Sequence, residues 1–198
     1  MPIPTTKQIT PKQVLDKALG RIQDNSATMR LRALGFLNEI LQEFATIRDW
    51  KCLQEEVNLQ MVDGVISHPA GYDKCLKIAG SNFTLTTANQ IHHYNETVEY
   101  YDGFVDFDNS LLVFPTVTLE VSIRYKKVVP EVEDNITPLL FPKDVLPYLV
   151  RAVLTACYEY DDDDRFTSSM IKASSLLKTL KMWDNNQQSM PSMSKYIR

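Results

Sequence analysis

The sequence predicts an α+β fold: a helical bundle built from N- and C-terminal helices, with an inserted small antiparallel β region. Three observations support this prediction. Apolar residues recur at helical spacing toward both ends of the 198-residue chain. The middle of the chain has short apolar runs broken by glycine, proline and Asp-Gly steps, which is typical of short strands and loops. One segment in that middle part alternates strictly between apolar and polar residues, which indicates a strand.

Two helices are expected in the N-terminal part. For the first, at about residues 11–23, Thr10 is a suitable N-cap and Pro11 fits the first helical position, where its missing N–H costs nothing. Ser26 can cap a second helix at about residues 28–49. The apolar stripe of this second helix is broad, so other elements must cover it. We assign to this stripe Leu31, Leu34, Leu37, Leu41 and Phe44.

The β region is expected at about residues 56–128. Its clearest element is "TVTLEVSIRY", in which five apolar residues alternate with polar ones and predict one buried face. A tight turn at Asp108-Asn109-Ser110 is expected to join two further strands. The apolar positions of the alternating strand are Val117, Leu119, Val121, Ile123 and Tyr125.

A proline-punctuated connector, "KKVVPEVEDNITPLLFPKD", leads to the C-terminal helices. These are expected at about residues 143–159 and 165–183, so that residues 1–183 form one domain. The remaining segment, residues 184–198, is polar and poor in core-forming residues, and we expect a flexible C-terminal arm.

Composition excludes several classes of protein. The formal net charge is −4 and no block of lysine or arginine is present, which argues against tight binding to nucleic acid. The cysteines Cys52, Cys75 and Cys157 are far apart and form no CxxC pair, so we expect reduced thiols. The N-terminus has no apolar signal segment, and no apolar run approaches the roughly 20 residues that span a bilayer.

The segment "YEYDDDDRF" places four aspartates, Asp161, Asp162, Asp163 and Asp164, between the two C-terminal helices. Such a run can be a metal site, a catalytic acid cluster or a solvated joint. Consecutive side chains point apart, whereas calcium loops place acidic ligands at alternate positions around a glycine. Aspartate is unfavourable inside helices and caps helix N-termini. We therefore favour a joint, with Asp164 or Thr167 as the cap of the last helix.

Other catalytic patterns are weak. The histidines His68, His92 and His93 lack the spacing of a zinc site. No nucleophile elbow, phosphate-binding loop or dinucleotide fingerprint is present, so we expect no cofactor and no enzyme activity. An acid pair such as Glu55 with Asp63 would suit glycoside hydrolysis, but any acidic protein supplies such pairs.

The order of features from Tyr101 to Trp183 is more specific. A hairpin ends in a Phe-Pro step and is followed by the alternating strand ending in Tyr125. An acidic linker with proline, the motif "PLLFP", an apolar helix, the acidic break and a last helix complete the series. This order resembles the head-to-tail connector proteins (adaptor or head-completion proteins) of tailed bacteriophages. The helix "ALGFLNEILQEFATIRDW" fits the same family, whereas residues 59–93 are longer than a minimal adaptor needs.

The resemblance implies a structural role in the neck of the virion, after assembly in the host cytoplasm. By this resemblance, about twelve copies are expected to form a ring beneath the portal protein. Head-to-tail contacts between copies give such a ring when their rotation closes. The ring continues the DNA channel without sequence-specific binding and offers a platform to the next tail component, a nozzle or a tail tube. The resemblance assigns residues 184–198 as the portal-binding arm, with Met190, Pro191, Met193, Tyr196, Ile197 and Arg198 as its contact residues.

Acidic residues suit the wall of such a channel, because carboxylates repel phosphates and let a duplex slide. We expect some of Asp161 to Asp164 to face the channel or the rim of the ring. The linker acids Glu131, Glu133 and Asp134 are the second candidates.

The sequence leaves three other functions open. A tail-completion or tail tube protein would contact the tail rather than the portal. A cell-wall hydrolase would need an essential acid, for which Glu55, Glu56 and Glu96 are the first candidates. A small host-directed binding module would stay monomeric beside its own portal.

Overall fold

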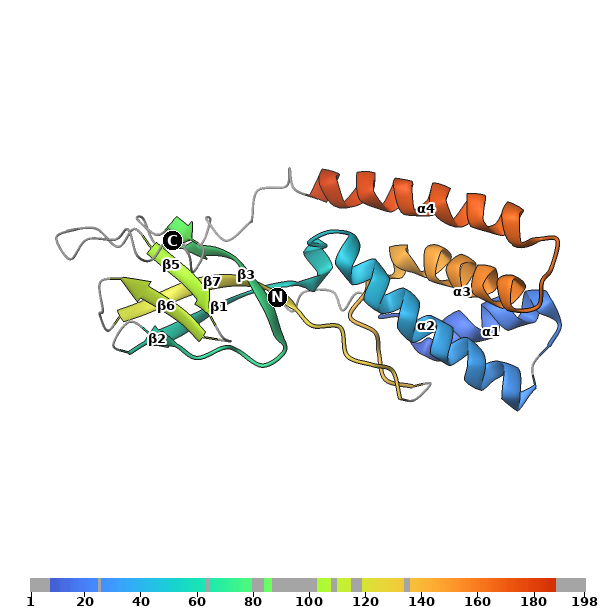
Figure 1. Ribbon diagram of the computed structural model, residues 1–198, viewed down its shortest axis with the longest axis horizontal. Coiled ribbons are helices and arrows are strands. Elements are labelled where there is room, and N and C mark those ends of the chain that lie inside the picture. Colours follow the sequence, from blue (N-terminus) through green and yellow to red (C-terminus); the bar gives the residue numbers. More distant parts are fainter. Residues whose placement is uncertain are drawn as a thin grey trace, which may run out of the picture. The chain divides into compact units, whose positions relative to one another are not determined.

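The computed structural model divides the chain into two compact units. The helical unit consists of Met1–Cys52 and Val129–Arg198, and the β unit of Leu53–Val128. The β unit is therefore inserted in the sequence of the helical unit, and the α+β class is confirmed (Figure 1). The structure describes residues 8–24, 26–62, 65–79, 84–86, 103–107, 110–114, 119–133 and 136–187.

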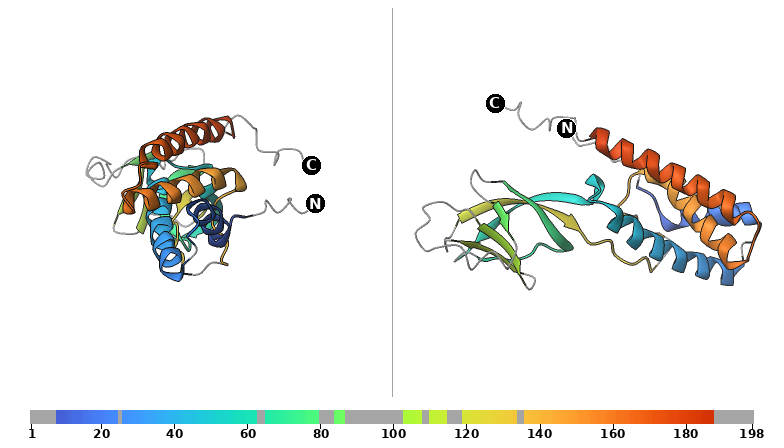
Figure 2. Two further views of the ribbon diagram at one scale, coloured as in Figure 1. Left: turned by 90° about the vertical axis from the view of Figure 1, so that its right-hand side faces the viewer. Right: turned by 45° about the horizontal axis from the view of Figure 1, so that its top comes forward.

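Four helices make up the regular part of the helical unit described by the structure. They are α1 (Pro11–Ile22), α2 (Ala27–Ile47), α3 (Leu146–Tyr160) and α4 (Phe166–Gln187). The central helix is α3, which packs against the other three (Figures 1 and 2). Short 3-10 helices, η1 (Lys51–Leu53) and η3 (Lys143–Val145), follow α2 and precede α3. No helix in the described ranges is both long enough and apolar enough to cross a membrane.

Local signals determine where α1 and α2 begin. The Thr10 hydroxyl accepts a hydrogen bond from Gln13 N at 3.4 Å, and the Gln13 side chain accepts one from Thr10 N at 3.3 Å, which completes a capping box. The Ser26 hydroxyl caps α2 by accepting from Met29 N at 3.2 Å. Both starts follow from side chains close in sequence, which explains why the sequence predicted them.

The core of the helical unit is aromatic around Phe44, which is fully buried. The Phe44 ring stacks on Trp50 with a centroid distance of 4.2 Å and meets the edge of Phe141 at 5.3 Å. Tyr148 of α3 lies 5.2 Å from the same ring, and the Trp50 indole donates to the Phe44 carbonyl at 2.6 Å.

One prediction for the apolar stripe of α2 is wrong. Leu31 is 73% exposed, because the buried residues of α2 follow the line from Met29 through Ala33 to Leu37 and leave Leu31 on the outer face.

The connector after the β unit is held on α2 by two amide side chains. Asn38 donates to the Val132 carbonyl at 3.2 Å and accepts from Val132 N at 2.8 Å, as a neighbouring strand would. Gln42 donates to the Val129 carbonyl at 2.9 Å. These bonds join residues roughly ninety positions apart, so they fix the connector to the bundle although it has no regular structure.

The first sheet of the β unit has the order β1-β7-β3 and is antiparallel throughout. Its strands are β1 (Gln54–Met61), β3 (Tyr72–Ala79) and, in the centre, β7 (Leu119–Lys127). The strand predicted from strict alternation is therefore confirmed from Leu119 onward, while residues 115–118 lie outside the described part. Ile123 and Tyr125 are buried as expected. Lys126 is also buried, which the alternation did not predict, and its ammonium lies 3.2 Å from the Asp73 carboxylate.

The second sheet has the order β2-β6-β5-β4. Its strands are β2 (Val65–Ile66), β4 (Thr84–Thr86), β5 (Gly103–Phe107) and β6 (Ser110–Phe114). The hairpin expected around residues 108–110 is present as an antiparallel pair of β5 and β6. One pair departs from the antiparallel arrangement of the β region, because β4 pairs in parallel with β5. A parallel pair needs a crossover of about a dozen residues or more, and residues 87–102 between the two strands supply that length.

Candidate functional site

The four aspartates form a tight joint between α3 and α4. Asp161 N donates to the Cys157 carbonyl at 3.1 Å and ends α3, while Asp163 N reaches the Tyr158 carbonyl at 2.9 Å. Asp162 has a left-handed backbone with φ of 51°, which aspartate tolerates better than most residues. Below the joint, the Thr155 and Ser169 hydroxyls lie 2.8 Å apart and link the two helices.

Asp163 holds the joint together. Its carboxylate accepts the Arg165 backbone N–H at 2.8 Å and pairs with the Arg165 guanidinium at 2.6 Å (Oδ2 to Nη2) and 2.9 Å (Oδ1 to Nε). These hydrogen bonds lower the pKa of Asp163 to about 2. The guanidinium also lies over the Tyr158 ring, 4.5 Å from its centroid. Asp163 therefore bonds the backbone at the start of α4, which corrects the prediction that Asp164 or Thr167 would do so.

The other three aspartates have no such structural task. Asp161, Asp162 and Asp164 are exposed, and none makes an ion pair with a residue in the ranges that the structure describes. Their charges are consequently available to an external partner. Asp161 also affects a buried neighbour, Cys157. The burial of the Cys157 thiol, and to a smaller extent the negative charge of Asp161, raise the pKa of that thiol to about 11. That thiol stays protonated at neutral pH, which makes it a poor nucleophile.

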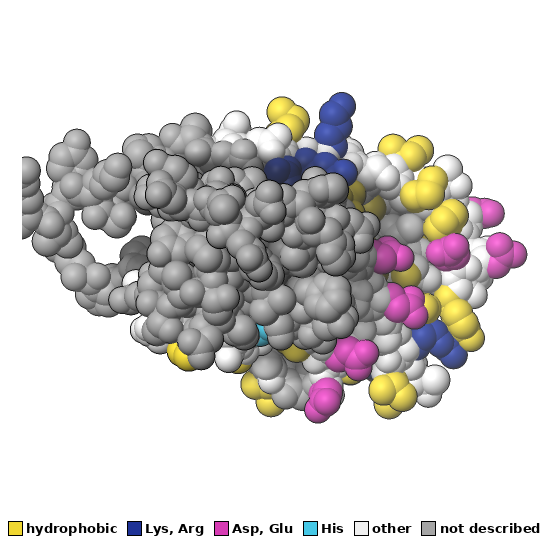
Figure 3. Space-filling model, turned by 60° about the vertical axis from the view of Figure 1, so that its left-hand side comes forward, with side chains coloured by type: hydrophobic (Ala, Val, Ile, Leu, Met, Phe, Trp, Pro, Cys, Tyr) yellow, Lys and Arg dark blue, Asp and Glu magenta, His cyan; other side chains and the backbone are white. Residues whose placement is uncertain are grey.

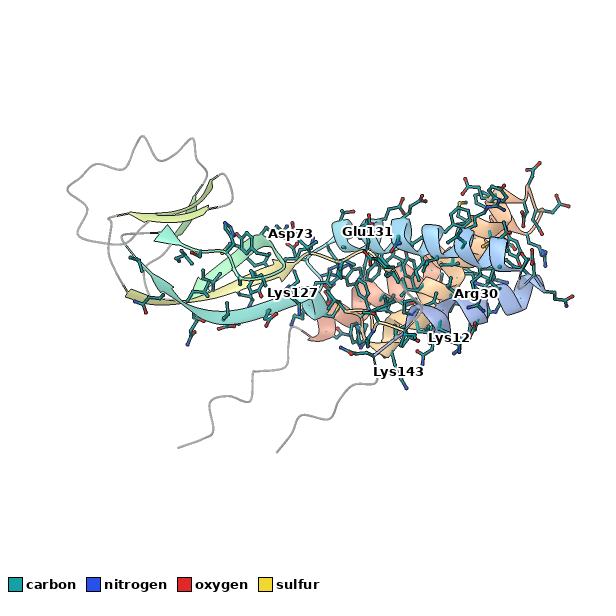
Figure 4. The ribbon with its side chains drawn as sticks, turned by 90° about the horizontal axis from the view of Figure 1, so that it is seen from below. Lys12, Arg30, Asp73, Lys127, Glu131 and Lys143 are labelled. Atoms are coloured by element: carbon teal, nitrogen blue, oxygen red, sulfur yellow. The ribbon has the colours of Figure 1, made fainter. Side chains whose placement is uncertain are left out.

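The linker acids are also available on the surface. Glu131 and Glu133 are exposed on either side of Val132, the residue that Asn38 holds, and Figure 4 shows Glu131 beside α2 at the edge of the helical unit. The connector forms an apolar hollow of about 400 Å³, which Glu131 and Glu133 help to line. Asp134, the third linker acid, lies outside the described residues. In the described surface seen in Figure 3, acidic side chains lie among hydrophobic ones.

The beginning of the expected arm is helical, which corrects the boundary at residue 184. The helix α4 continues to Gln187, and Asp184 is fully buried. Its carboxylate accepts the Lys51 backbone N–H at 3.1 Å and lies 3.1 Å from the Arg48 guanidinium, which also donates to the carbonyl of Lys181. A buried carboxylate with these partners ties the end of α4 to the end of α2. The expected contact residues Met190, Met193, Tyr196, Ile197 and Arg198 lie outside the described residues.

Sequence reasoning missed Asp184, although a signal was present. The buried residues of α4 recur at Ser169, Leu180 and Asp184, and half-buried Ala173 and Leu176 fall on the same face. Asp184 therefore continues the helical period that Leu180 and Leu176 establish. The surrounding polar residues, "DNNQQ", suggested a solvated segment instead.

The acids considered for hydrolysis have ordinary structural surroundings. Glu56 is exposed and accepts from the Arg124 guanidinium at 2.9 Å. Glu55 is exposed, lies 3.3 Å from Lys127 Nζ and accepts from the Tyr125 hydroxyl at 3.3 Å. The burial of the Tyr125 hydroxyl, and to a smaller extent the negative charge of Glu55, raise the pKa of Tyr125. Asp63 and Glu96 lie outside the described residues.

Within the described ranges, no group of three histidine, cysteine, aspartate or glutamate side chains is placed to hold a metal ion. The His68 ring packs edge-on against Tyr72 with a centroid distance of 4.0 Å. The other two histidines, His92 and His93, lie outside the described residues. No disulfide joins the three cysteines, all of which lie in the described ranges: Cys75 and Cys157 are buried and Cys52 is half-buried.

The helical unit thus combines a C-terminal helix tied to α2 with acidic side chains exposed at the joint and on the connector. A family model described as SU10 adaptor protein matches residues 9–193 of the chain. The match covers both units and nearly the whole sequence, so the chain belongs to this family of phage head-to-tail adaptor proteins. A search of curated proteins found no match.

Proposed function

We propose that this protein forms a ring beneath the portal of the phage capsid, connects the capsid to the tail and continues the DNA channel. The family match over residues 9–193 carries the proposal. Head-to-tail contacts between identical copies close into a ring when their rotation allows it, here with about twelve copies. In this proposal the upper surface binds the portal, the lower surface receives the next tail component, and DNA passes through without sequence-specific binding.

The proposed contact with the portal is the segment that continues α4. Residues 188–198 carry apolar side chains spaced along an otherwise polar sequence, which suits a segment that orders on a partner's surface. Asp184 supports this role because it fixes the end of α4 against Arg48 and Lys51. A fixed exit point lowers the entropy that a binding segment loses when it reaches its partner.

Removing residues 188–198 is expected to abolish binding to the portal ring while leaving the helical unit folded. The cut falls after Gln187, so Asp184 and its bonds remain in place. The measurement is native mass of full-length and truncated chains, alone and mixed with the portal ring of the same virus. A matched variant keeps the length of the segment and replaces Met190, Met193, Tyr196 and Ile197 by serine.

Both variants are expected to lose portal binding if apolar contacts hold the segment. A truncated chain that still binds the portal would contradict the proposed contact. A full-length chain that stays monomeric and never joins the portal would overturn the ring and favour a tail-side or host-directed protein.

The proposed channel surface includes the exposed acids, and two triple variants test it. D161N/D162N/D164N leaves Asp163 and its bonds to Arg165 intact, and E131Q/E133Q/D134N removes the same amount of charge from the connector. Neutralising the three acids that face the channel removes their repulsion of the DNA phosphates. The ring is then expected to bind duplex DNA at low salt, and ejection of the genome through the ring is expected to become slower. The other set serves as the control. Wild-type assembly and wild-type DNA retention in both variants would refute a role for these acids in the channel.

A further inference from the structure

A cleft of about 240 Å³ lies among α1, α3 and α4 of the helical unit. Its charged walls come from Lys17 and Arg21 on α1 and Arg151 on α3. Its apolar lining comes from Leu146, Pro147, Val150 and Leu176. The cleft thus combines three cations with a hydrophobic surface.

The three cations are not neutralised within the described part of the chain, where none of them makes an ion pair. Asp16, next to Lys17 in sequence, pairs instead with Arg30 of α2 at 2.5 Å. Lys17 and Arg21 are four residues apart on one helix, a spacing at which like charges destabilise each other. An anionic partner would remove this repulsion.

The apolar lining indicates what kind of anion this is. Nucleic-acid backbones are bound by surfaces that are polar and strongly basic. A protein surface that carries carboxylates beside an apolar side chain matches both parts of the cleft, since protein interfaces surround an apolar centre with polar groups.

Such a surface exists on α2 of the same chain. Leu31, Gly35, Glu39 and Glu43 follow one another at four-residue steps and form a ridge along the helix. Leu31 is 73% exposed, and Glu39 and Glu43 are exposed with no ion pair to any described residue. The ridge therefore offers one apolar side chain and two carboxylates to a partner.

Gly35 adds an observation of a different kind. Glycine inside a helix is less stable than alanine, and a Cβ added to Gly35 meets nothing within 4 Å. The described parts of the chain thus give no steric reason for a glycine there. Its absent side chain lets the surface of another molecule approach the helix backbone closely.

We propose that the cleft of one copy receives the α2 ridge of the neighbouring copy, with Leu31 against the apolar lining and Glu39 and Glu43 paired with the cations. This inference rests on the proposed ring. Cleft and ridge are different surfaces of one helical unit, so every copy carries one of each. The contact is heterologous, and its repetition continues until the ring closes.

Two charge-reversal variants test the contact by native mass, with and without the portal ring. K17E/R21E/R151E gives the cleft the charge of the ridge, and E39K/E43K gives the ridge the charge of the cleft. Each variant alone is expected to associate at least 100-fold more weakly than the wild type, because like charges then meet at every interface. Four of the five side chains are exposed and Arg151 is half-buried, so both variants are expected to fold as the wild type does.

An equimolar mixture of the two variants is expected to assemble again. In the mixture each reversed cleft meets a reversed ridge and each native cleft meets a native ridge, so the two variants alternate around the ring. The control K172E/K178E/K181E reverses three exposed lysines of α4 and is expected to assemble like the wild type. A second variant, Gly35→Leu, is expected to fold normally and to lose assembly through steric exclusion at the ridge.

Several outcomes would overturn this contact without touching the ring itself. The contact is refuted if either reversal variant, or Gly35→Leu, assembles as well as the wild type. It is also refuted if the mixture of the two reversal variants does not assemble, or if the α4 control loses assembly to the same extent as they do. A different result would assign the cleft to nucleic acid instead: the wild type binds short duplex DNA, E39K/E43K keeps this binding, and K17E/R21E/R151E loses it. If the wild type itself never assembles, with or without the portal, the proposed function fails and this contact fails with it.

Discussion

Replacing Phe44 with alanine is expected to lower the free energy of unfolding of the helical unit by about 3–5 kcal/mol. Phe44 is fully buried, and its ring contacts Trp50, Phe141 and Tyr148 from three different segments. Alanine leaves a cavity that these rings cannot all collapse to fill. A loss of this size is a large share of the roughly 5–15 kcal/mol by which domains are stable.

The measurement is urea unfolding followed by tryptophan fluorescence. Both tryptophans of the chain, Trp50 and Trp183, belong to the helical unit, so the signal reports on that unit alone. The matched control is Phe36→Ala on the same helix, where the ring is only half-buried and its aromatic neighbour, Tyr160, lies 6.3 Å away. The control is expected to lose about 1 kcal/mol. Equal losses in the two variants would contradict the central role of Phe44.

Replacing Asp184 with alanine is the second change with a large expected effect. The substitution leaves the Lys51 backbone N–H without its acceptor and removes the carboxylate partner of Arg48. Loss of one member of a buried ion pair costs about 3–5 kcal/mol, and the partial exposure of Arg48 reduces the expected loss to about 2–3 kcal/mol. Asp184→Asn keeps an acceptor for Lys51 N and is expected to lose less.

Tryptophan fluorescence and hydrogen exchange would separate two consequences of this change. The free energy of unfolding is expected to fall, and the last turns of α4 are expected to exchange faster because their tie to α2 is gone. The control is Asp164→Ala, which removes an exposed carboxylate and is expected to change stability by about 0.5 kcal/mol or less. If Asp184→Ala behaves like this control, the carboxylate does not hold the end of α4.

The same residue links stability to the proposed function. A frayed α4 would release the point from which residues 188–198 continue, and the binding segment would lose more entropy on reaching the portal. Asp184→Ala is therefore expected to weaken portal binding, even though the Asp184 side chain is fully buried within the helical unit and does not itself touch the portal in this proposal. Truncation after Gln187 removes the contact residues directly, so the two experiments distinguish positioning from contact.

Signals between residues close in sequence were sufficient for much of the fold. Thr10 and Pro11 placed the start of α1, and Ser26 placed the start of α2, because a cap needs only partners within one turn. The alternation ending at Tyr125 identified β7. The run from Asp161 to Asp164 was correctly predicted to be a joint between helices, since aspartate disfavours helix interiors.

The sequence by itself thus determined the helices, the central strand, the joint and the order of features by which the adaptor family was predicted. The tertiary structure decided which residue within each of these local patterns is buried, exposed or paired with a distant segment. It made Asp163 the residue that closes the joint, exposed Leu31, paired buried Lys126 with Asp73 and tied Asp184 to α2. The physical reason is the range of the interactions: caps and periodicity act within a turn or a strand, whereas burial and ion pairing depend on which distant segments pack together.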